Sequence, residues 1–186
     1  MNAIFKAALD VQEFCVQRSW RFCFIGGLAV QRWGEPRMTR DADLTLLTGF
    51  GTEEPFIDAL LGAFEGRRSD AREFALSHRV LLARHANGTP LDIALGALPF
   101  EEDSVRRSSP WNIGEGSLRT CSAEDLVIHK TFAGRDQDWL DVRGVLIRNG
   151  HRLDLDLVRR ELVPLLELKA AGPHLDKLNQ IIRELL

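Results

Sequence analysis

The stretch from Phe22 to Leu47 reads FCFIGGLAVQRWGEPRMTRDADLTLL and predicts the centre of the fold. Its four apolar residues stop at Gly26-Gly27, which is typical of a short buried strand that ends in a sharp turn. The residues that follow favour a helix. A helix that begins at such a turn offers uncovered backbone N–H groups and the positive end of its dipole, so the junction indicates a phosphate-binding turn. A tight turn without a ligand is the alternative.

Two aspartates stand near the end of this stretch, in Asp41-Ala42-Asp43-Leu44. Alternate residues of a strand share a face, so both carboxylates are expected on the same side. Neighbouring carboxylates ionise together only at a cost, unless a cation lies between them. Mg²⁺ or Mn²⁺ is the expected cation, because these ions take hard oxygen ligands and share them with substrate phosphates. Exposed acids at a strand edge are the alternative interpretation.

A third acid, Asp92, interrupts the apolar sequence Leu91-Asp92-Ile93-Ala94-Leu95. This segment is the predicted return strand of a hairpin that turns at Asn87-Gly88. A buried carboxylate without a partner is expensive, so we expect Asp92 to join the other two acids as a metal ligand. Pairing of Asp92 with Arg79 or Arg84 across the hairpin is the alternative.

Composition limits the classes of protein to which the chain can belong. Its 186 residues suit one domain, or one domain with a small helical appendage, and the net charge of −3 argues against a broad basic surface for nucleic acid. The three cysteines have no zinc-like spacing, so buried reduced thiols are expected. Neither a signal peptide nor a membrane span is indicated, and the expected location is the cytoplasm, without a membrane partner.

The remaining pattern predicts an α/β fold, with a mixed sheet flanked by helices and a helical C-terminal region. The predicted division is a core over residues 1–120 and a helical region over residues 121–186. Residues 99–117 are rich in Pro, Ser, Gly and charge, and predict a long connection with at most one helical turn. The helices are expected at 2–18, after 28, from 55 to 64, around 70–76, and at 122–134, 136–149, 153–162, 164–171 and 175–186.

The glycine pair, the spaced Asp41-x-Asp43, the later Asp92 strand and a lysine-containing helix together resemble the active-site signature of DNA polymerase β-like nucleotidyltransferases. The sequence Arg37-x-Thr39-Arg40-Asp41 resembles more closely the AbiEii-type branch, many of whose members are toxin–antitoxin components. The helix that carries Lys130 resembles the second motif of that branch.

The resemblance implies a nucleotidyltransferase-like fold and a set of site residues. In this implied site, three aspartates bind the nucleotide's ion and a second ion. Asp138 forms an ion pair with Lys130 or Arg135. The implied catalytic residues are Asp41, Asp43, Asp92 and Lys130, the first three also being the metal ligands. The implied nucleotide contacts are Gly26, Gly27, Thr39, Arg40, Lys130, Arg135 and Asp138. An ordinary helix face with ion pairs is the alternative for the last three.

The resemblance implies transfer of a nucleoside monophosphate from an NTP, such as ATP, to a hydroxyl group, with release of pyrophosphate. For an AbiEii-like toxin, the acceptor would be tRNA or another macromolecule such as a protein, and an antitoxin would be the partner. Small aminoglycoside nucleotidyltransferases share the glycine pair and the spaced acids, so a cationic antibiotic is an alternative acceptor. A nucleotidyltransferase-like module that binds a partner without catalysis is the third hypothesis.

Overall fold

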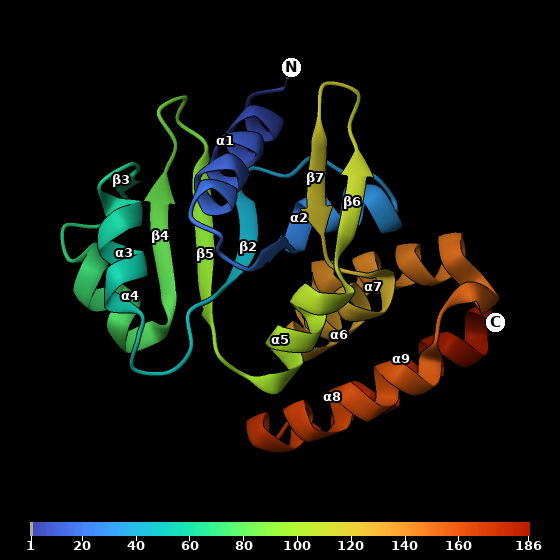
Figure 1. Ribbon diagram of the computed structural model, residues 1–186. Helices are drawn as coiled ribbons and strands as arrows, with labels where there is room; N and C mark the ends of the chain where they lie inside the picture. Colours follow the sequence, from blue (N-terminus) through green and yellow to red (C-terminus); the bar gives the residue numbers. More distant parts are fainter. Residues whose placement is uncertain (1) are drawn as a thin grey trace. The chain divides into compact units, whose positions relative to one another are not determined.

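The computed structural model describes residues 2–186. The chain forms two compact units. The first contains the chain up to Leu28 together with Met38–Cys121, and the second contains Ala29–Arg37 and Ser122–Leu186. The predicted α/β architecture is confirmed, because a mixed sheet is flanked by helices and the C-terminal region is helical (Figure 1).

The first unit is built on a mixed sheet with seven strands among the described residues. The strand order is β3-β4-β5-β2-β1-β7-β6, and β2 pairs antiparallel with β1 but parallel with β5. The parallel pair is joined by a long crossover, as parallel strands require. The strands are β1 Phe22–Phe24, β2 Ala42–Leu47, β3 Glu65–Gly66, β4 Val80–Arg84, β5 Pro90–Gly96, β6 Ser109–Asn112 and β7 Ser117–Thr120.

One face of this sheet carries the hydrophobic core of the first unit. Leu44, Leu91 and Ile93 stand next to Asp43 or Asp92 along their strands and pack with buried residues of α1 and α3. Asp43 and Asp92 therefore lie on the opposite face. The helices contained in this unit are α1 Ala3–Gln17, α3 Glu54–Leu61, α4 Ala71–His78 and α5 Pro99–Arg107.

The expectation of a long connection over 99–117 is wrong. This segment forms α5 and then the antiparallel pair β6–β7. Pro99 occupies the first turn of α5, where its missing N–H is harmless, and the Glu101 carboxylate accepts hydrogen bonds from the backbone N–H groups of Ala97 and Leu98. Gly114 has a φ of +88° in the β6–β7 turn. The Pro, Ser and Gly residues therefore begin a helix and close a hairpin.

The second unit is helical. It holds most of α2 Gly26–Trp33, together with α6 Ala123–Ala133, α7 Asp136–Asn149, α8 Leu155–Lys169 and α9 Pro173–Leu185. Ser122 caps α6 as predicted, since its hydroxyl accepts a hydrogen bond from the Asp125 N–H. The predicted break at Pro164 is wrong, because α8 continues through it. Pro164 leaves the carbonyl of Arg160 without its helical donor, and Arg160 is exposed to water there.

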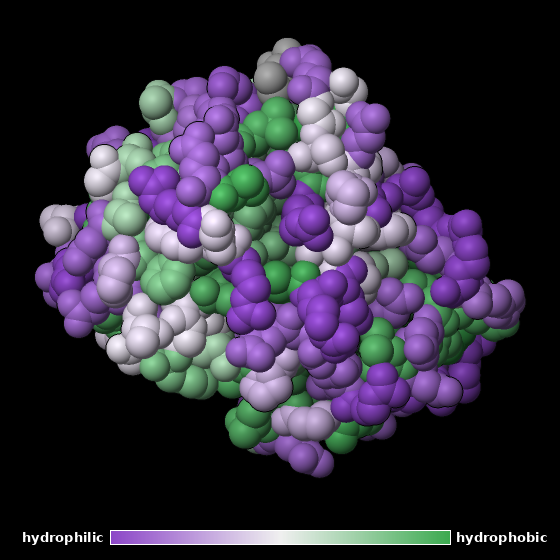
Figure 2. Space-filling view, viewed as in Figure 1, coloured by the Kyte–Doolittle hydropathy of each residue, from purple (hydrophilic) through white to green (hydrophobic). Residues whose placement is uncertain are grey.

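The exposed surface is mixed in character. In the view of Figure 2, hydrophilic residues are spread over the surface, and hydrophobic ones form small separate groups. Within residues 2–186, no helix has both the length and the apolar composition that a membrane crossing requires. The three cysteines are buried and form no disulfide among the described residues, as expected.

Candidate metal and nucleotide site

The three acids predicted as metal ligands come together in the first unit. Asp43 on β2 and Asp92 on β5 are paired in the parallel register, and Asp41 lies one residue before β2. One carboxylate oxygen of each acid lies within 4.8 Å of one oxygen of each other acid. All three side chains are partly exposed, so a ligand can reach them from solvent.

The spacing of these oxygens fits a divalent cation. Mg²⁺ holds its oxygen ligands at about 2.1 Å, so two ligands on opposite sides of the ion are about 4.2 Å apart. Separations of up to 4.8 Å mean that the carboxylates need to move only a few tenths of an ångström to bind one ion. They could also share two ions. The acidic cluster can thus hold a metal, and carboxylate ligands suit hard divalent cations such as Mg²⁺, Mn²⁺ and Ca²⁺.

The glycine pair is required by close packing against this cluster. Gly26 has a φ of +56°, and a Cβ there would lie 2.0 Å from Oδ2 of Asp43. A Cβ at Gly27 would lie 2.2 Å from Oγ1 of Thr39. The predicted strand–glycine–helix junction is present, because β1 ends at Phe24 and α2 begins at Gly26. The turn therefore packs directly beside Asp43 and Thr39, as expected of a triphosphate-binding turn at this site.

Thr39 and Arg40, the predicted nucleotide contacts, precede the cluster along the chain. The Thr39 hydroxyl lies 3.2 Å from both the backbone carbonyl and Oδ1 of Asp41, which orients that carboxylate. Arg40 is exposed. That these two residues contact the nucleotide remains a prediction, and Thr39 also orients one acid of the cluster.

The surroundings of Asp92 disfavour its ionised form. Burial raises the pKa of Asp92, the guanidinium of Arg67 opposes that rise, and the charge of Asp41 adds to it, so the pKa lies above its usual value. Arg67 donates a hydrogen bond to Oδ1 of Asp92. The alternative partners considered for Asp92 have other contacts or face solvent: Arg79 bonds Glu53 and the Leu95 carbonyl, and Arg84 is exposed.

Sequence reasoning did not find Arg67. It follows β3, a strand of two residues, and so short a strand has no detectable alternation. The arginine reaches Asp92 because β3, β4 and β5 lie side by side, a pairing of distant segments. A single sequence carries no signal for such a contact.

The predicted residues Lys130, Arg135 and Asp138 form a separate charged cluster in the second unit. The Lys130 side chain is only 9% exposed, and its Nζ lies 3.0 Å from Oδ1 of Asp138 and 2.9 Å from Oδ2 of Asp141. Arg135 Nε lies 2.8 Å from the other oxygen of Asp138, while its side chain is 77% exposed. The expected ion pairs between Asp138 and these cations are therefore present, and the expected triphosphate contacts stay predictions.

Arg37 completes this second cluster. Its Nε and Nη2 lie 2.8 and 2.9 Å from the two carboxylate oxygens of Asp141, a bidentate pair. Burial acts to raise the pKa of both Asp138 and Asp141, but hydrogen bonds outweigh it. Those from Arg135 and Lys130 lower the pKa of Asp138, and those from Arg37 and Lys130 lower that of Asp141. Asp141 was missed because it meets Lys130 and Arg37 only in the folded unit.

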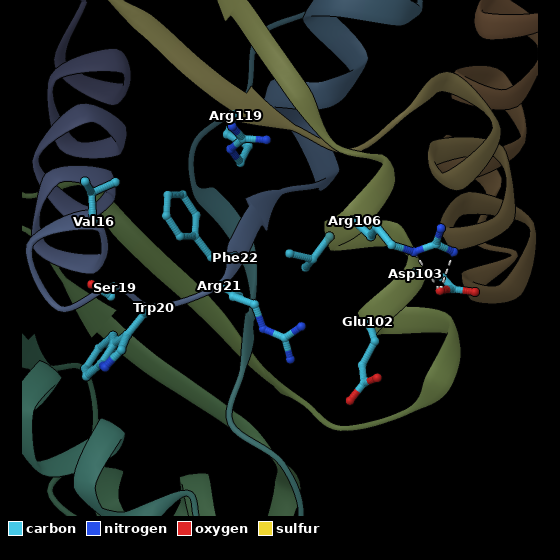
Figure 3. A pocket seen from close by; sticks show the side chains of 10 residues that line it. Val16, Ser19, Trp20, Arg21, Phe22, Glu102, Asp103, Arg106 and Arg119 are labelled. Atoms are coloured by element: carbon cyan, nitrogen blue, oxygen red, sulfur yellow. Dashed lines mark hydrogen bonds and ion pairs between the residues drawn. The ribbon is translucent and has the colours of Figure 1, made fainter.

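A cavity of about 520 Å³ also lies in the first unit, away from the acids. Figure 3 shows it between the end of α1 and α5, where Trp20, Phe22 and Arg119 are among the lining residues. Phe22 pairs with Leu46 at the start of β1, whereas Asp43 lies beyond the other end of that ladder. The cavity and the acidic cluster therefore have no residue in common.

Comparisons with known proteins support the fold. No protein-family model and no curated protein sequence matches the chain. An antigenic nucleotidyltransferase-like protein from Paracoccidioides brasiliensis is similar in structure, with a TM-score of 0.50 and 14% identity, over 95% of this chain and 91% of that one.

The antibiotic-resistance factor ANT(2'')-Ia is similar to the same degree, with a TM-score of 0.50 and 17% identity, over 94% of this chain and 95% of that one. At such identities the likeness bears on the fold alone. Together with the position of the acids and the glycine turn, it leads to one conclusion: this chain has a nucleotidyltransferase-like fold that carries a cluster of three aspartates able to hold a metal ion.

Proposed function

We propose that the protein is a metal-dependent nucleotidyltransferase that moves a nucleoside monophosphate from an NTP to a hydroxyl group and releases pyrophosphate. The observation that carries the proposal is the convergence of three carboxylates within 4.8 Å beneath a glycine turn. The nucleotidyltransferase-like fold supplies the context in which such a cluster has this chemistry.

In this proposal, Asp41 and Asp43 hold the cation that accompanies the triphosphate, and Asp92 shares a second one. The bound metal would neutralise charge on the triphosphate and the leaving pyrophosphate and lower the pKa of the acceptor hydroxyl. Thr39 keeps the Asp41 carboxylate oriented through its hydroxyl. The backbone N–H groups at Gly26 and Gly27 would contact the phosphates, since the turn packs closely beside Asp43 and Thr39.

Asp92 has a second role as the proton acceptor. In the metal-free protein, burial and the charge of Asp41 raise the pKa of its carboxyl, which favours uptake of a proton. The acceptor oxygen attacks the α-phosphorus as its proton passes to Asp92, and the bond from the α-phosphorus to the pyrophosphate oxygen breaks. Arg40, Lys130 and Arg135 are the proposed cationic contacts of the nucleotide, and Asp138 orients the last two.

The acceptor proposed first is a macromolecule. The sequence Arg37-x-Thr39-Arg40-Asp41-x-Asp43 resembles that of AbiEii-type toxins, which supports tRNA or a protein as the acceptor and an antitoxin as the partner. Under this proposal, free protein would modify bulk tRNA, and a partner would prevent it.

An aminoglycoside is the second candidate acceptor, and a specific comparison favours it. The chain is similar to the antibiotic-resistance factor over 95% of that protein's length, so it is about as long as a resistance enzyme. A net charge of −3 also suits a cationic antibiotic better than a polyanionic RNA.

The proposal is tested first by metal and nucleotide binding. Asp43→Asn removes a direct ligand, and since loss of even an outer-shell partner costs about 10–100-fold in metal affinity, we expect at least that loss for the Mn²⁺–NTP complex. Isothermal titration calorimetry measures it. Asp70→Asn, at an exposed acid paired with Arg68, is the control and should bind as the wild type does.

A transfer assay then identifies the acceptor. Each α-³²P-labelled NTP is incubated with bulk tRNA, with a panel of aminoglycosides, and with neither. Label on tRNA supports the toxin proposal, and label on an aminoglycoside supports the second candidate. Unchanged Mn²⁺–NTP affinity in Asp43→Asn would contradict the metal site, and NTP binding without any transfer would indicate a binding module.

A further inference from the structure

A line of residues crosses the sheet of the first unit and ends at the acidic cluster. The Arg67 N–H donates to the Leu82 carbonyl over 2.9 Å, Leu82 pairs with Asp92, and Asp92 pairs with Asp43. Neighbouring strands are about 4.8 Å apart, so Arg67 begins about 10 Å from the Asp92 backbone. Its side chain spans β4 to place a guanidinium on Asp92.

We infer that Arg67 is a built-in cation of this site, which holds Asp92 in the metal-free protein and competes with the second divalent ion for that carboxylate. The inference rests on the proposed function and adds a positioning residue to it. In this role, Arg67 keeps the three acids together before substrate arrives. It also limits occupation of the second metal position until the nucleotide brings further ligands.

The contact has the burial that such a role needs. The Arg67 and Asp92 side chains are 23% and 32% exposed, so the pair is screened by solvent less than a surface ion pair is. The guanidinium bonds one oxygen of the Asp92 carboxylate, a group that also belongs to the acidic cluster. A positive charge at this place repels a second cation and occupies one of its ligands.

The hydrogen bonding of Arg67 is also incomplete, which makes it easier for a metal ion to replace Arg67 at Asp92. The Nε of Arg67 is buried, and no acceptor for it is found within residues 2–186. An unsatisfied buried donor costs free energy, so the protein does not hold this arginine as firmly as it holds Arg37, which binds both oxygens of Asp141. An arginine held at one end can yield Asp92 to an ion.

The test is a titration with Mn²⁺ alone, followed by the electron paramagnetic resonance signal of the free ion, which gives the affinity of each site. Arg67→Gln removes the charge and should tighten the second site at least about tenfold without nucleotide, because the repulsion and the competition are lost. Arg67→Lys keeps the charge and should leave the second site close to that of the wild type. The matched control is Arg68→Gln, at an exposed neighbour paired with Asp70, which should change nothing.

Thermal melts with EDTA and with Mn²⁺ supply a second measurement and verify folding. Arg67→Gln should melt earlier than the wild type in EDTA and gain more from Mn²⁺. A second-site affinity in Arg67→Gln that equals or falls below that of the wild type would overturn this inference alone, since it would make Arg67 purely structural. Absence of Mn²⁺ from every protein would overturn the proposed function as well.

Discussion

The two charged clusters of this protein use the same residue types to opposite effect. In the second unit, Asp138 and Asp141 are each bonded by two cations, and their pKa values lie below the usual range. In the first unit, Asp92 is contacted by Arg67 but lies near Asp41, and its pKa is raised. Burial acts to raise the pKa of all three carboxyls, so the neighbouring charges decide the direction.

This difference separates acids that are already paired with cations from acids that can still take a metal ion. In the Lys130 cluster, three cations surround two carboxylates, so both acids are fully paired, and breaking a buried network of this kind costs stability. The aspartate cluster gathers three carboxylates at a place that solvent can reach, with an ion pair to Arg67, so an added cation would lower its free energy further.

The largest effect is expected from Asp92→Asn. Loss of the proton acceptor should lower nucleotidyl transfer about 10²–10⁴-fold, while NTP affinity stays within about tenfold, because Asp41 and Asp43 still hold the nucleotide's ion. Transfer and binding assays on the same protein separate the two quantities.

The same variant should not lose stability. Asparagine removes a carboxylate whose ionised form is disfavoured in the folded protein, so in EDTA the midpoint of unfolding should stay the same or rise by about 2 °C. A folded Asp92→Asn protein with full activity would rule out its catalytic role. A variant that unfolds early but keeps its activity would make Asp92 a structural acid.

Lys130→Met should instead destabilise the protein by about 2–3 kcal/mol. The lysine is almost fully buried between two carboxylates, and breaking a buried pair leaves uncompensated charge, although Arg135 and Arg37 keep part of the pairing. Urea denaturation measures the loss. Lys6→Met, at an exposed lysine paired with Asp10, is the control and should cost less than about 1 kcal/mol.

This experiment also decides between two roles for Lys130. If Lys130→Met remains as stable as the wild type and loses NTP affinity, the lysine acts on the triphosphate as the sequence predicts. If stability falls and the folded fraction binds NTP normally, its role is confined to the ion network.

The smallest effect is expected on the melting temperature at acidic pH. Asp138 and Asp141 have lowered pKa values in the folded protein, so the stability they contribute is present above the unfolded value of about 3.9 and is lost as the pH falls through the folded values. Melting temperatures between pH 6 and pH 3 should therefore decline. The decline should be shallower in Lys130→Met, where less of the pKa shift remains, and equal slopes would exclude a contribution from this cluster.

Much of the fold could be predicted because its signals are local. The strand before Gly26, the turn at Asn87-Gly88 and the Ser122 cap each depend on a few adjacent residues, and the structure has all three. The predictions that were wrong concern segments whose local composition is compatible with two structures. Pro99 begins a helix and Pro164 lies within one, and neither position can be told from a break without the packing around it.

The candidate site was only partly predictable for the same reason. Asp41 and Asp43 are joined by strand spacing, and Asp92 stands out because it interrupts an apolar strand. Arg67 and Asp141 give no such signal, since each meets its partners through segments distant in the sequence. The chemistry of a cluster is therefore easier to predict than the residues that hold it in place.

The parallel pairing of β2 with β5 has a consequence for how the protein folds. Asp43 and Asp92 become neighbours only after the crossover through α3, β3, α4 and β4 has been closed, and such distant pairings form late and slowly. Joining them also brings like charges together, so the final closing of the sheet works against electrostatic repulsion. A divalent ion would find its ligands only in the closed sheet, where it would slow unfolding without hastening the early collapse of the chain.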